Sequence, residues 1–441
     1  MPRLRHLILA PLILAAASGS WAQSLQEVYQ AALAYDAAYL AARAQADSAQ
    51  YRAAQANALR LPNVVANGSA SRNETDFPTN LLTNPSGATV GTGLTTAELV
   101  GRQPLFNRDS DARISQAETL LQAAQADLQT AEDELIVRVA QTYFDVLVAQ
   151  DGLAAATANR VANGEQLASA KRNFEVGTAT ITDTREAQAR FDLGTAAEIA
   201  ADNDLRTKRV ALDQLIGRSN VAPKPLAVPV ALPVLAPSGI DDLVGQAQTN
   251  HPSVRKADLA LMFAKLETDR ARAGHLPTLD AVARAGANRV NGGSNPGTTS
   301  TYTLGVQFNL PIFSGYSVQN RIKETLSLEE RSRNDLEAAR RAVAQATRVN
   351  FFGYQSGQAQ VKALEAAESS SKLALEATQL GYRVGVRVNL DVLDAQTQLF
   401  RTQRDLSKAR YDVLLSGLRL RQASGTLLPT DINAVNAMLV K

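Results

Sequence analysis

The residues best suited to chemistry lie in one short stretch near the C-terminal end of the chain. It contains Asp391 and Asp394, preceded by Tyr382 and Arg387. Because the two aspartates are three positions apart, they project from one helix face about a turn apart. An arginine can hold such a carboxylate by a charge-assisted hydrogen bond, which is stronger than a neutral one. This pattern indicates electrostatic recognition of cations or a polar contact, and it does not by itself indicate a reaction.

Other features of the sequence argue against an enzyme. The chain has no cysteine, and its 3 histidines are scattered without metal-ligand spacing. We find no Ser/His/Asp set, no phosphate-binding loop and no cofactor motif. The net charge is +2, with acidic and basic residues mixed and few aromatics, so nucleic acid is not an expected partner. We therefore predict no catalytic residues, no metal site and no cofactor.

The stretch around Asp391 has a counterpart earlier in the chain. Placing Phe174 on Tyr382 gives a shift of 208 positions, and this one shift aligns several further residues. In each copy a glycine able to adopt positive φ ends a helical stretch, and an acidic residue opens the next. Each copy therefore predicts the tip of a hairpin of two antiparallel helices. The aligned pairs are Val176 with Val384, Gly177 with Gly385, Asp183 with Asp391, Glu186 with Asp394 and Gln188 with Gln396.

The first residues resemble an export signal. Arg3 and Arg5 precede an apolar run, and Ser20 and Ala22 supply the small residues of a cleavage site. We predict a signal peptide over residues 1–22. Because no other apolar run approaches the roughly twenty residues of a membrane-spanning helix, the mature protein should be exported without one.

The internal repeat divides the rest of the chain. We predict a first repeat over residues 23–220, a proline-rich linker over 221–240 outside the bundle, a second repeat over 241–426 and a short tail over 427–441. Each repeat should contain a helix, two strands, a long helix, the tip and a return helix. The expected helices cover 24–60, 107–176 and 183–217, then 241–273 and the regions flanking the second tip. The clearest strands cover 63–71, 279–288 and 302–310.

The strands alternate apolar and polar residues, as Tyr302, Leu304 and Val306 alternate with Thr303 and Gly305. This pattern fits a half-buried soluble sheet or the wall of a barrel that faces lipid. Four strands cannot close a barrel with a lumen, because single-chain barrels begin at about eight. Exposure to lipid would therefore require several chains to share one barrel. The polar lining would then include Asp280, Arg284, Asn288, Gln307 and Asn309.

The sequence resembles a known family, the outer-membrane efflux or TolC-like proteins. The specific residues are Gly381-Tyr382-Arg383-Val384-Gly385, then Asp391 to Ala395, with Ala409-Arg410-Tyr411, Leu276-Pro277 and Pro311 to Gly315 as further marks. The resemblance covers essentially the mature chain. It implies a mostly α-helical homotrimer with a small β part. Four strands per chain would make a 12-stranded outer-membrane β-barrel, which continues into a long periplasmic α-helical barrel.

The resemblance also implies a function and partners. The chain would be the outer-membrane channel, or exit duct, of a tripartite efflux pump or a type I secretion system of a Gram-negative cell. Export through it would be passive, driven by an inner-membrane transporter of RND or ABC type and connected by a periplasmic adaptor protein. The exported substrate cannot be read from the sequence. The alternative is an exported structural coiled-coil protein without a pore, which would explain the helices but not the amphipathic strands.

By the same resemblance, the tip residues form a gate. Asp391 and Asp394 correspond to acidic rings at the periplasmic entrance, and Gly177 and Gly385 to the tip turns. Tyr382 and Arg387 correspond to residues that hold the closed tip together through Thr182 and Asp183. A structural role remains open: Asp183 and Asp391 would each complement a helix dipole, and Thr182 could be a helix cap. Whether Glu186 joins the acidic ring also stays open.

Overall fold

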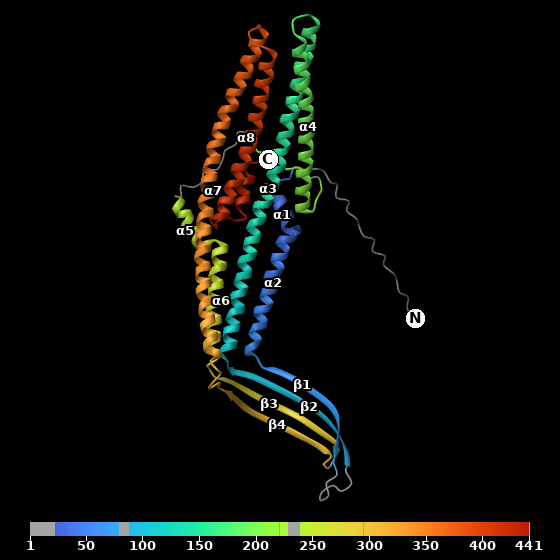
Figure 1. Cartoon of the computed structure of the whole chain (residues 1–441), viewed down its shortest axis with the longest axis vertical. Coiled ribbons are helices and arrows are strands. Elements are labelled where there is room, and N and C mark those ends of the chain that lie inside the picture. Colours follow the sequence, from blue (N-terminus) through green and yellow to red (C-terminus); the bar gives the residue numbers. More distant parts are fainter. Residues whose placement is uncertain (1–22, 79–87, 220, 228–238, 294, 441) are drawn as a thin grey trace, which may run out of the picture.

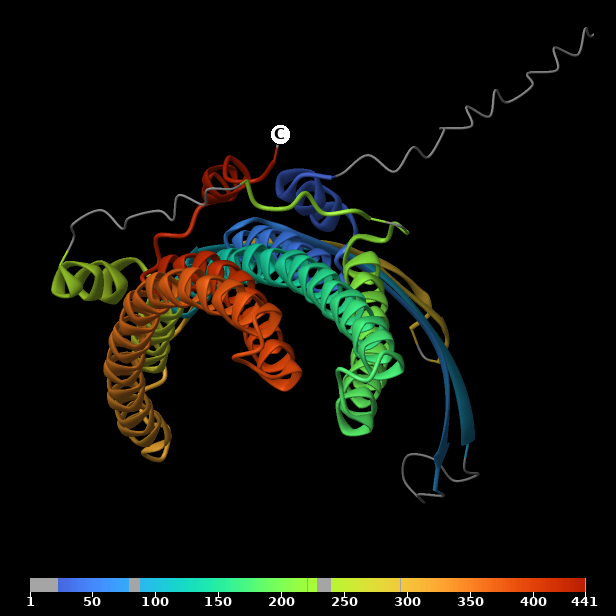
Figure 2. The ribbon, with the colours of Figure 1, turned by 90° about the horizontal axis from the view of Figure 1, so that it is seen from above.

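The computed structural model describes residues 23–78, 88–219, 221–227, 239–293 and 295–440. Helices form a long rod, and a curved sheet extends from one end of it (Figure 1). Seen along the rod, the helices make an arc, with α5 and the C-terminal end on its convex side (Figure 2). The expected signal peptide and residues 228–238 of the expected linker lie outside the described residues.

The first helical stretch is broken at Asp36. Helix α1 covers Leu25–Tyr35 and α2 covers Ala37–Asn57, followed by a short 3-10 turn at Ala58–Arg60. Asp36 is extended, with ψ of 115°, and its carboxylate accepts a hydrogen bond of 2.8 Å from the backbone N–H of Tyr39. This contact caps α2 in the manner expected of an aspartate at a helix start. The prediction of one continuous helix over 24–60 was therefore wrong.

The corresponding stretch of the second half is also broken. Helix α5 covers Ile240–Asn250 and α6 covers Pro252–Ala273, and His251 separates them. Proline at 252 disfavours helical backbone at the residue before it. The imidazole Nδ1 of His251 accepts a hydrogen bond of 3.1 Å from the N–H of Ser253, which caps α6. The expected single helix over 241–273 was wrong, although Pro252 was a visible signal.

Two very long helices run through the rod, as the uninterrupted pattern predicted. Helix α3 covers Arg108–Glu175 and α7 covers Ser317–Arg383, with 68 and 67 residues. At 1.5 Å per residue each spans about 100 Å. Helix α4 (Ile181–Ile216) packs along the tip half of α3, and α2 packs along its other half (Figure 1). Helix α8 (Asn389–Ala423) and α6 pack on α7 in the same way.

Four antiparallel strands form one sheet in the order β1-β2-β3-β4. They are β1 (Asn63–Phe77), β2 (Ala88–Phe106), β3 (Thr278–Gly292) and β4 (Gly297–Asn309). The central pair, β2 with β3, joins the two halves in a register that sets Ala97 opposite Ala287. The strands β1 and β3 extend beyond the expected ranges because pairing continues through polar segments that show no apolar alternation.

One face of the sheet is apolar and exposed. Tyr302, Leu304 and Val306 on β4 have exposed fractions of 82%, 86% and 64%. The opposite face carries the polar residues expected to line a lumen, and all of them except Asp280 are exposed. Asp280 is buried and forms an ion pair of 2.6 Å with Arg102 across β2 and β3. The expectation that Asp280 would be wetted was wrong, because the neighbouring strand supplies a cation that covers it.

The largest hydrophobic core lies midway along the rod. It brings together α1, α3, α4, α8 and the short helix α9 (Asp431–Asn436), with Leu25, Leu212 and Ile432 almost fully buried. Val221 and Leu226 also belong to this core, so the described start of the linker packs into the bundle, contrary to expectation. The hydroxyl of Tyr143 accepts a hydrogen bond of 2.7 Å from the N–H of Lys224 and donates to the carbonyl of Gln23 at 3.0 Å. Among the described helices, none combines the length and apolar content required to cross a membrane.

Candidate functional site

The two hairpin tips have the same backbone geometry. Gly177 and Gly385 adopt φ of 81° and 78°, a left-handed conformation that favours glycine. The first turn is closed by a hydrogen bond of 2.8 Å from the N–H of Thr178 to the carbonyl of Asn173, and the second by one of 2.8 Å from Val386 to Gly381. These donors and acceptors are again 208 positions apart, so the sequence repeat corresponds to a structural repeat.

Tyr382 lies beside the other tip, but its contact is not with the residues expected from the resemblance. Its hydroxyl accepts a hydrogen bond of 3.2 Å from the side-chain Nδ2 of Asn173, at the end of α3. Within the described chain, no hydrogen bond joins Tyr382 to Thr182 or Asp183. Asn173 was missed because it lies before the tip glycine, whereas the resemblance directed attention to the residues after it.

Asp183 has a structural role in the single chain. Its backbone N–H donates to Thr180 Oγ1 at 3.2 Å, and its carboxylate accepts from the N–H of Thr180 at 2.9 Å. This reciprocal pair is a capping box, which satisfies two free donors at the start of α4. The helix cap is therefore Thr180 and not Thr182, so that part of the alternative was wrong. Thr182 itself is exposed in the first turn.

Arg387 crosses the second tip. Its guanidinium lies 3.6 Å from the carboxylate of Asp391, four residues ahead on α8. A Cβ atom added to Gly381 would lie 2.8 Å from Cγ of Arg387, so the stem of this arginine needs the glycine beneath it. Both side chains of the ion pair are substantially exposed, and the interaction between them is correspondingly weak. Arg387 thus remains accessible to other partners.

Asp394 makes the shortest contact between the two hairpins near the tips. Its Oδ1 lies 2.7 Å from Nη2 of Arg190 on α4, a residue 204 positions earlier in the chain. The sequence reasoning missed Arg190. A usable signal was present, because Arg190 follows Asp183 by seven residues and so lies two turns further on the same face of the return helix. Glu186, the repeat counterpart of Asp394, is half-buried on α4.

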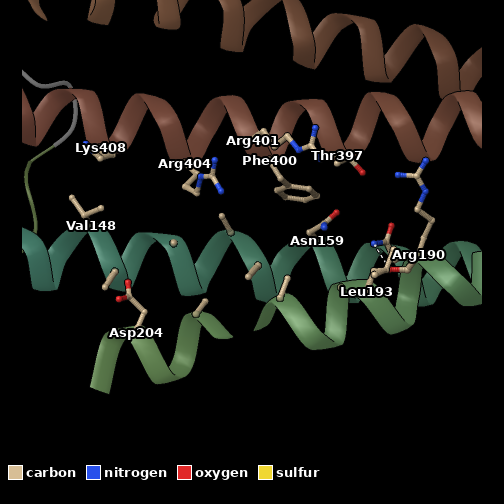
Figure 3. A pocket seen from close by; sticks show the side chains of 18 residues that line it. Val148, Asn159, Arg190, Leu193, Asp204, Thr397, Phe400, Arg401, Arg404 and Lys408 are labelled. Atoms are coloured by element: carbon tan, nitrogen blue, oxygen red, sulfur yellow. Dashed lines mark hydrogen bonds between the residues drawn. The ribbon is translucent and has the colours of Figure 1, made fainter. Parts of the chain in front are cut away.

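Next to this ion pair, a groove of about 440 Å³ runs between α3, α4 and α8. Its floor consists largely of small residues, including Gly152 and Gly194, and long side chains from α8 form its opposite wall (Figure 3). Arg404 and Lys408 in this wall are paired with Asp405 and Asp412 of their own helix. The positive charges of Arg404 and Lys408 in the groove are thus offset by carboxylates of the same helix. Among the described residues, no three His, Asp or Glu side chains are grouped as a metal site would require.

Comparison with known proteins identifies what these tips and strands belong to. Residues 28–218 and 243–426 match the family described as outer membrane efflux protein. The chain belongs to this family. It is 32% identical over 440 residues to outer membrane protein TolC of Vibrio cholerae, covering 98% of each sequence. It is also 28% identical to alkaline protease secretion protein AprF of Pseudomonas aeruginosa, covering 100% of this chain and 92% of AprF.

Solved structures agree on the fold. A crystal structure of CusC superposes with a TM-score of 0.79 at 19% identity, covering 92% of each chain. The outer-membrane channel OprN gives a TM-score of 0.77 at 18% identity, covering 96% of this chain and 98% of OprN. The predicted fold class, a mostly helical chain whose few strands contribute to a barrel, is confirmed.

Membership of the efflux family also confirms the predicted cellular location and the general function of the protein. The protein is an exit channel of the outer membrane that extends into the periplasm and serves efflux or type I secretion. The alternative of a pore-free coiled-coil protein is not supported.

Proposed function

We propose that three copies of this chain form one closed channel whose periplasmic entrance is gated by the hairpin tips. The observation that carries the proposal is the open sheet. Its edge strands β1 and β4 each have one neighbour within the chain, and the apolar face of β4 is exposed. An open edge is not stable in lipid, where every backbone N–H and C=O must be paired. Three sheets of four strands would supply twelve strands, enough to close a barrel.

The channel itself would carry out no reaction and bind no cofactor. Transport would be driven by an inner-membrane pump of RND or ABC type, and a periplasmic adaptor would connect that pump to the tips. The names of the relatives support both kinds of system, since AprF and PrtF are secretion proteins for proteases and TtgC belongs to an efflux pump. We therefore assign the choice of substrate to the pump and not to this chain.

Asp391 and Asp394 would form the entrance gate. Threefold symmetry would bring six carboxylates to one axis, where they would attract cations and repel anions. Tyr382 and Arg387 would hold the closed tip through Thr182 and Asp183. In the single chain Arg387 is 62% exposed and Thr182 is also exposed, so these residues are free to meet across a subunit boundary. The turns at Gly177 and Gly385 would fix the direction in which each return helix leaves the tip.

The proposal is tested by purifying the full-length protein from outer membranes. Native mass spectrometry should give a trimer, and planar-bilayer recording should give a conductance that favours cations. Monomers without conductance, or recovery from the soluble periplasm without detergent, would refute the channel as proposed. Conductance without cation preference would leave the trimer in place and refute the acidic gate.

A further inference from the structure

Arg190 joins two hairpins that otherwise have few polar links near their tips. Its guanidinium lies 2.7 Å from Asp394, and the exposed fractions of the two side chains are 32% and 57%. We propose that Arg190 is a gate residue, which clasps the two hairpins of one subunit in the resting tip and masks the charge of Asp394 until the tip opens. This inference rests on the proposed role of Asp394 at the entrance.

The backbone of Arg190 is fixed against α3. Its carbonyl accepts a hydrogen bond of 3.3 Å from Nδ2 of Asn163, whose side chain is almost fully buried. One turn later, Gly194 lets α4 approach α3 closely, since a Cβ there would lie 3.4 Å from Cα of Arg160. The first hairpin therefore holds the start of the Arg190 side chain, and the guanidinium reaches across the groove toward α8 (Figure 3).

Asp394 is fixed by the second hairpin in a similar way. The preceding residues Val392 and Leu393 have no exposed surface, and α8 packs against α7 to form the second hairpin. Asp394 itself is exposed on the surface of α8, where its carboxylate contacts the guanidinium of Arg190. Because each partner is held by a different hairpin, the hairpins cannot separate at this level without breaking the ion pair.

Only two polar contacts between the hairpins precede the middle of the rod in the described residues. One is the hydrogen bond of 3.2 Å between Asn173 and Tyr382, and the other is the Arg190–Asp394 pair. The next is the contact between Asp151 and Ser407, which lies between three and four turns further along α8 than Asp394. Arg190 thus contributes one of two polar restraints on the part that must move for the entrance to widen.

The pair also affects charge. A cation in direct contact with a carboxylate cancels most of its field at distances beyond a few ångströms. In a trimer, three arginines would offset three of the six carboxylates of the proposed ring. Separation of the hairpins would expose these charges, so we expect cation preference to rise as the entrance opens. Arg190 would then couple the selectivity of the gate to its conformation.

The test compares Arg190→Gln with Arg185→Gln in the full-length trimer. Arg185 is an exposed arginine on the same helix without an ion-pair partner among the described residues, so its replacement removes the same charge without breaking the clasp. Because the chain has no cysteine, Ala189→Cys and Gln398→Cys can carry a pair of spin labels on α4 and α8. Arg190→Gln should lengthen and broaden the distance distribution, whereas Arg185→Gln should leave it unchanged.

The same variants are then recorded in planar bilayers. Arg190→Gln should raise single-channel conductance about two- to fivefold, as expected for the loss of an exposed ion pair, and increase cation preference. The exchanged pair Arg190→Asp with Asp394→Arg should restore the parental distance. Parental distances and conductance in Arg190→Gln would overturn the clasp. If the parent does not conduct at all, the proposed channel gate fails, while the spin-label distances still decide whether Arg190 holds the hairpins together.

Discussion

The hydroxyl of Tyr382, at the end of α7, accepts a hydrogen bond of 3.2 Å from the side-chain amide of Asn173, at the end of α3. The two residues are 209 positions apart and each precedes the tip glycine of its own hairpin. This contact makes the two tips of one chain a single unit. It also gives Tyr382 a partner within the subunit, while Arg387 stays exposed for a partner outside it.

We expect the double variant Tyr382→Phe with Arg387→Ser to open the entrance without dissociating the trimer. Each lost contact is polar and partly wet, worth about 1 kcal/mol, which is small beside the stability of the fold. Single-channel conductance should therefore rise several-fold while the trimer persists on native gels. Asn173→Ala should reproduce the Tyr382→Phe part of the effect, since both changes remove the same hydrogen bond.

A matched control for this variant is Tyr51→Phe with Arg383→Ser. Both residues are exposed and have no hydrogen-bonding partner among the described residues, yet the same two chemical groups are lost. Conductance in the control should equal that of the parent. If the latch variant also conducts like the parent, Tyr382 and Arg387 do not hold the entrance closed.

The acidic residues should act on selectivity, and Asp394 should also act on closure through its ion pair with Arg190. We expect Asp391→Asn with Asp394→Asn to lower cation preference and to weaken block by divalent cations, because the proposed ring loses its charge. Reversal potentials under a salt gradient measure the first effect, and titration with a divalent cation measures the second. The control Asp47→Asn with Asp258→Asn removes the same charge from exposed positions on α2 and α6. An equal loss of cation preference in the control and in the ring variant would assign selectivity to the net charge of the protein.

The sequence predicted the long helices and the tips well because their signals are local. An uninterrupted helical period determined α3, and the glycines at the two tips marked where it and α7 end. The break at Asp36 was not predicted, since an aspartate in an alanine-rich helical pattern is as compatible with an exposed helix face as with a cap. Strand ends were underestimated because pairing with a neighbour, not alternation, sustains β1 beyond Ser71.

The site was predictable only in part, for a different reason. The shift of 208 positions identifies equivalent residues in the two halves, but it does not say which residues face each other. The contact between Arg190 and Asp394 depends on how α4 packs against α8, which is a tertiary property. Residues that share a helix face could be derived from spacing, as for Asp391 and Asp394, whereas partners across the two hairpins could not.

Gly425 should be sensitive to any side chain. It ends α8 with φ of 67°, and a Cβ there would lie 2.8 Å from Cα of His251 and 2.9 Å from its backbone nitrogen. Because the left-handed backbone disfavours any side chain and the added Cβ would clash with His251, we expect Gly425→Ala to lower the free energy of unfolding by about 1–3 kcal/mol. Gly353→Ala on α7 is the control, because its Cβ would meet nothing within 4 Å and alanine favours helix. Urea unfolding should separate the two, and equal midpoints would contradict this explanation.

Asp133, in the middle of α3, should make the stability of the protein depend on pH. Burial, and then the charges of Glu132 and Glu134, raise the pKa of its carboxyl from 3.8 to about 7. Between about pH 4 and pH 7 the unfolded chain ionises this group while the folded chain keeps it protonated, so the folded state binds more protons. The free energy of unfolding therefore falls as pH rises from about 4 to 7, and it loses nothing further from this group at higher pH.

Replacing Asp133 by asparagine removes that penalty, because the amide stays neutral at every pH. A shift of this size corresponds to at most about 4 kcal/mol at 1.36 kcal/mol per unit. We expect Asp133→Asn to raise the thermal unfolding midpoint at pH 8 and to change it little at pH 4. Asp127→Asn is the control, since Asp127 lies less than two turns earlier on α3 and is half-exposed in an ion pair with Lys256. An equal shift of the midpoint at both pH values in Asp133→Asn would show that the effect comes from packing and not from ionisation of the buried carboxyl.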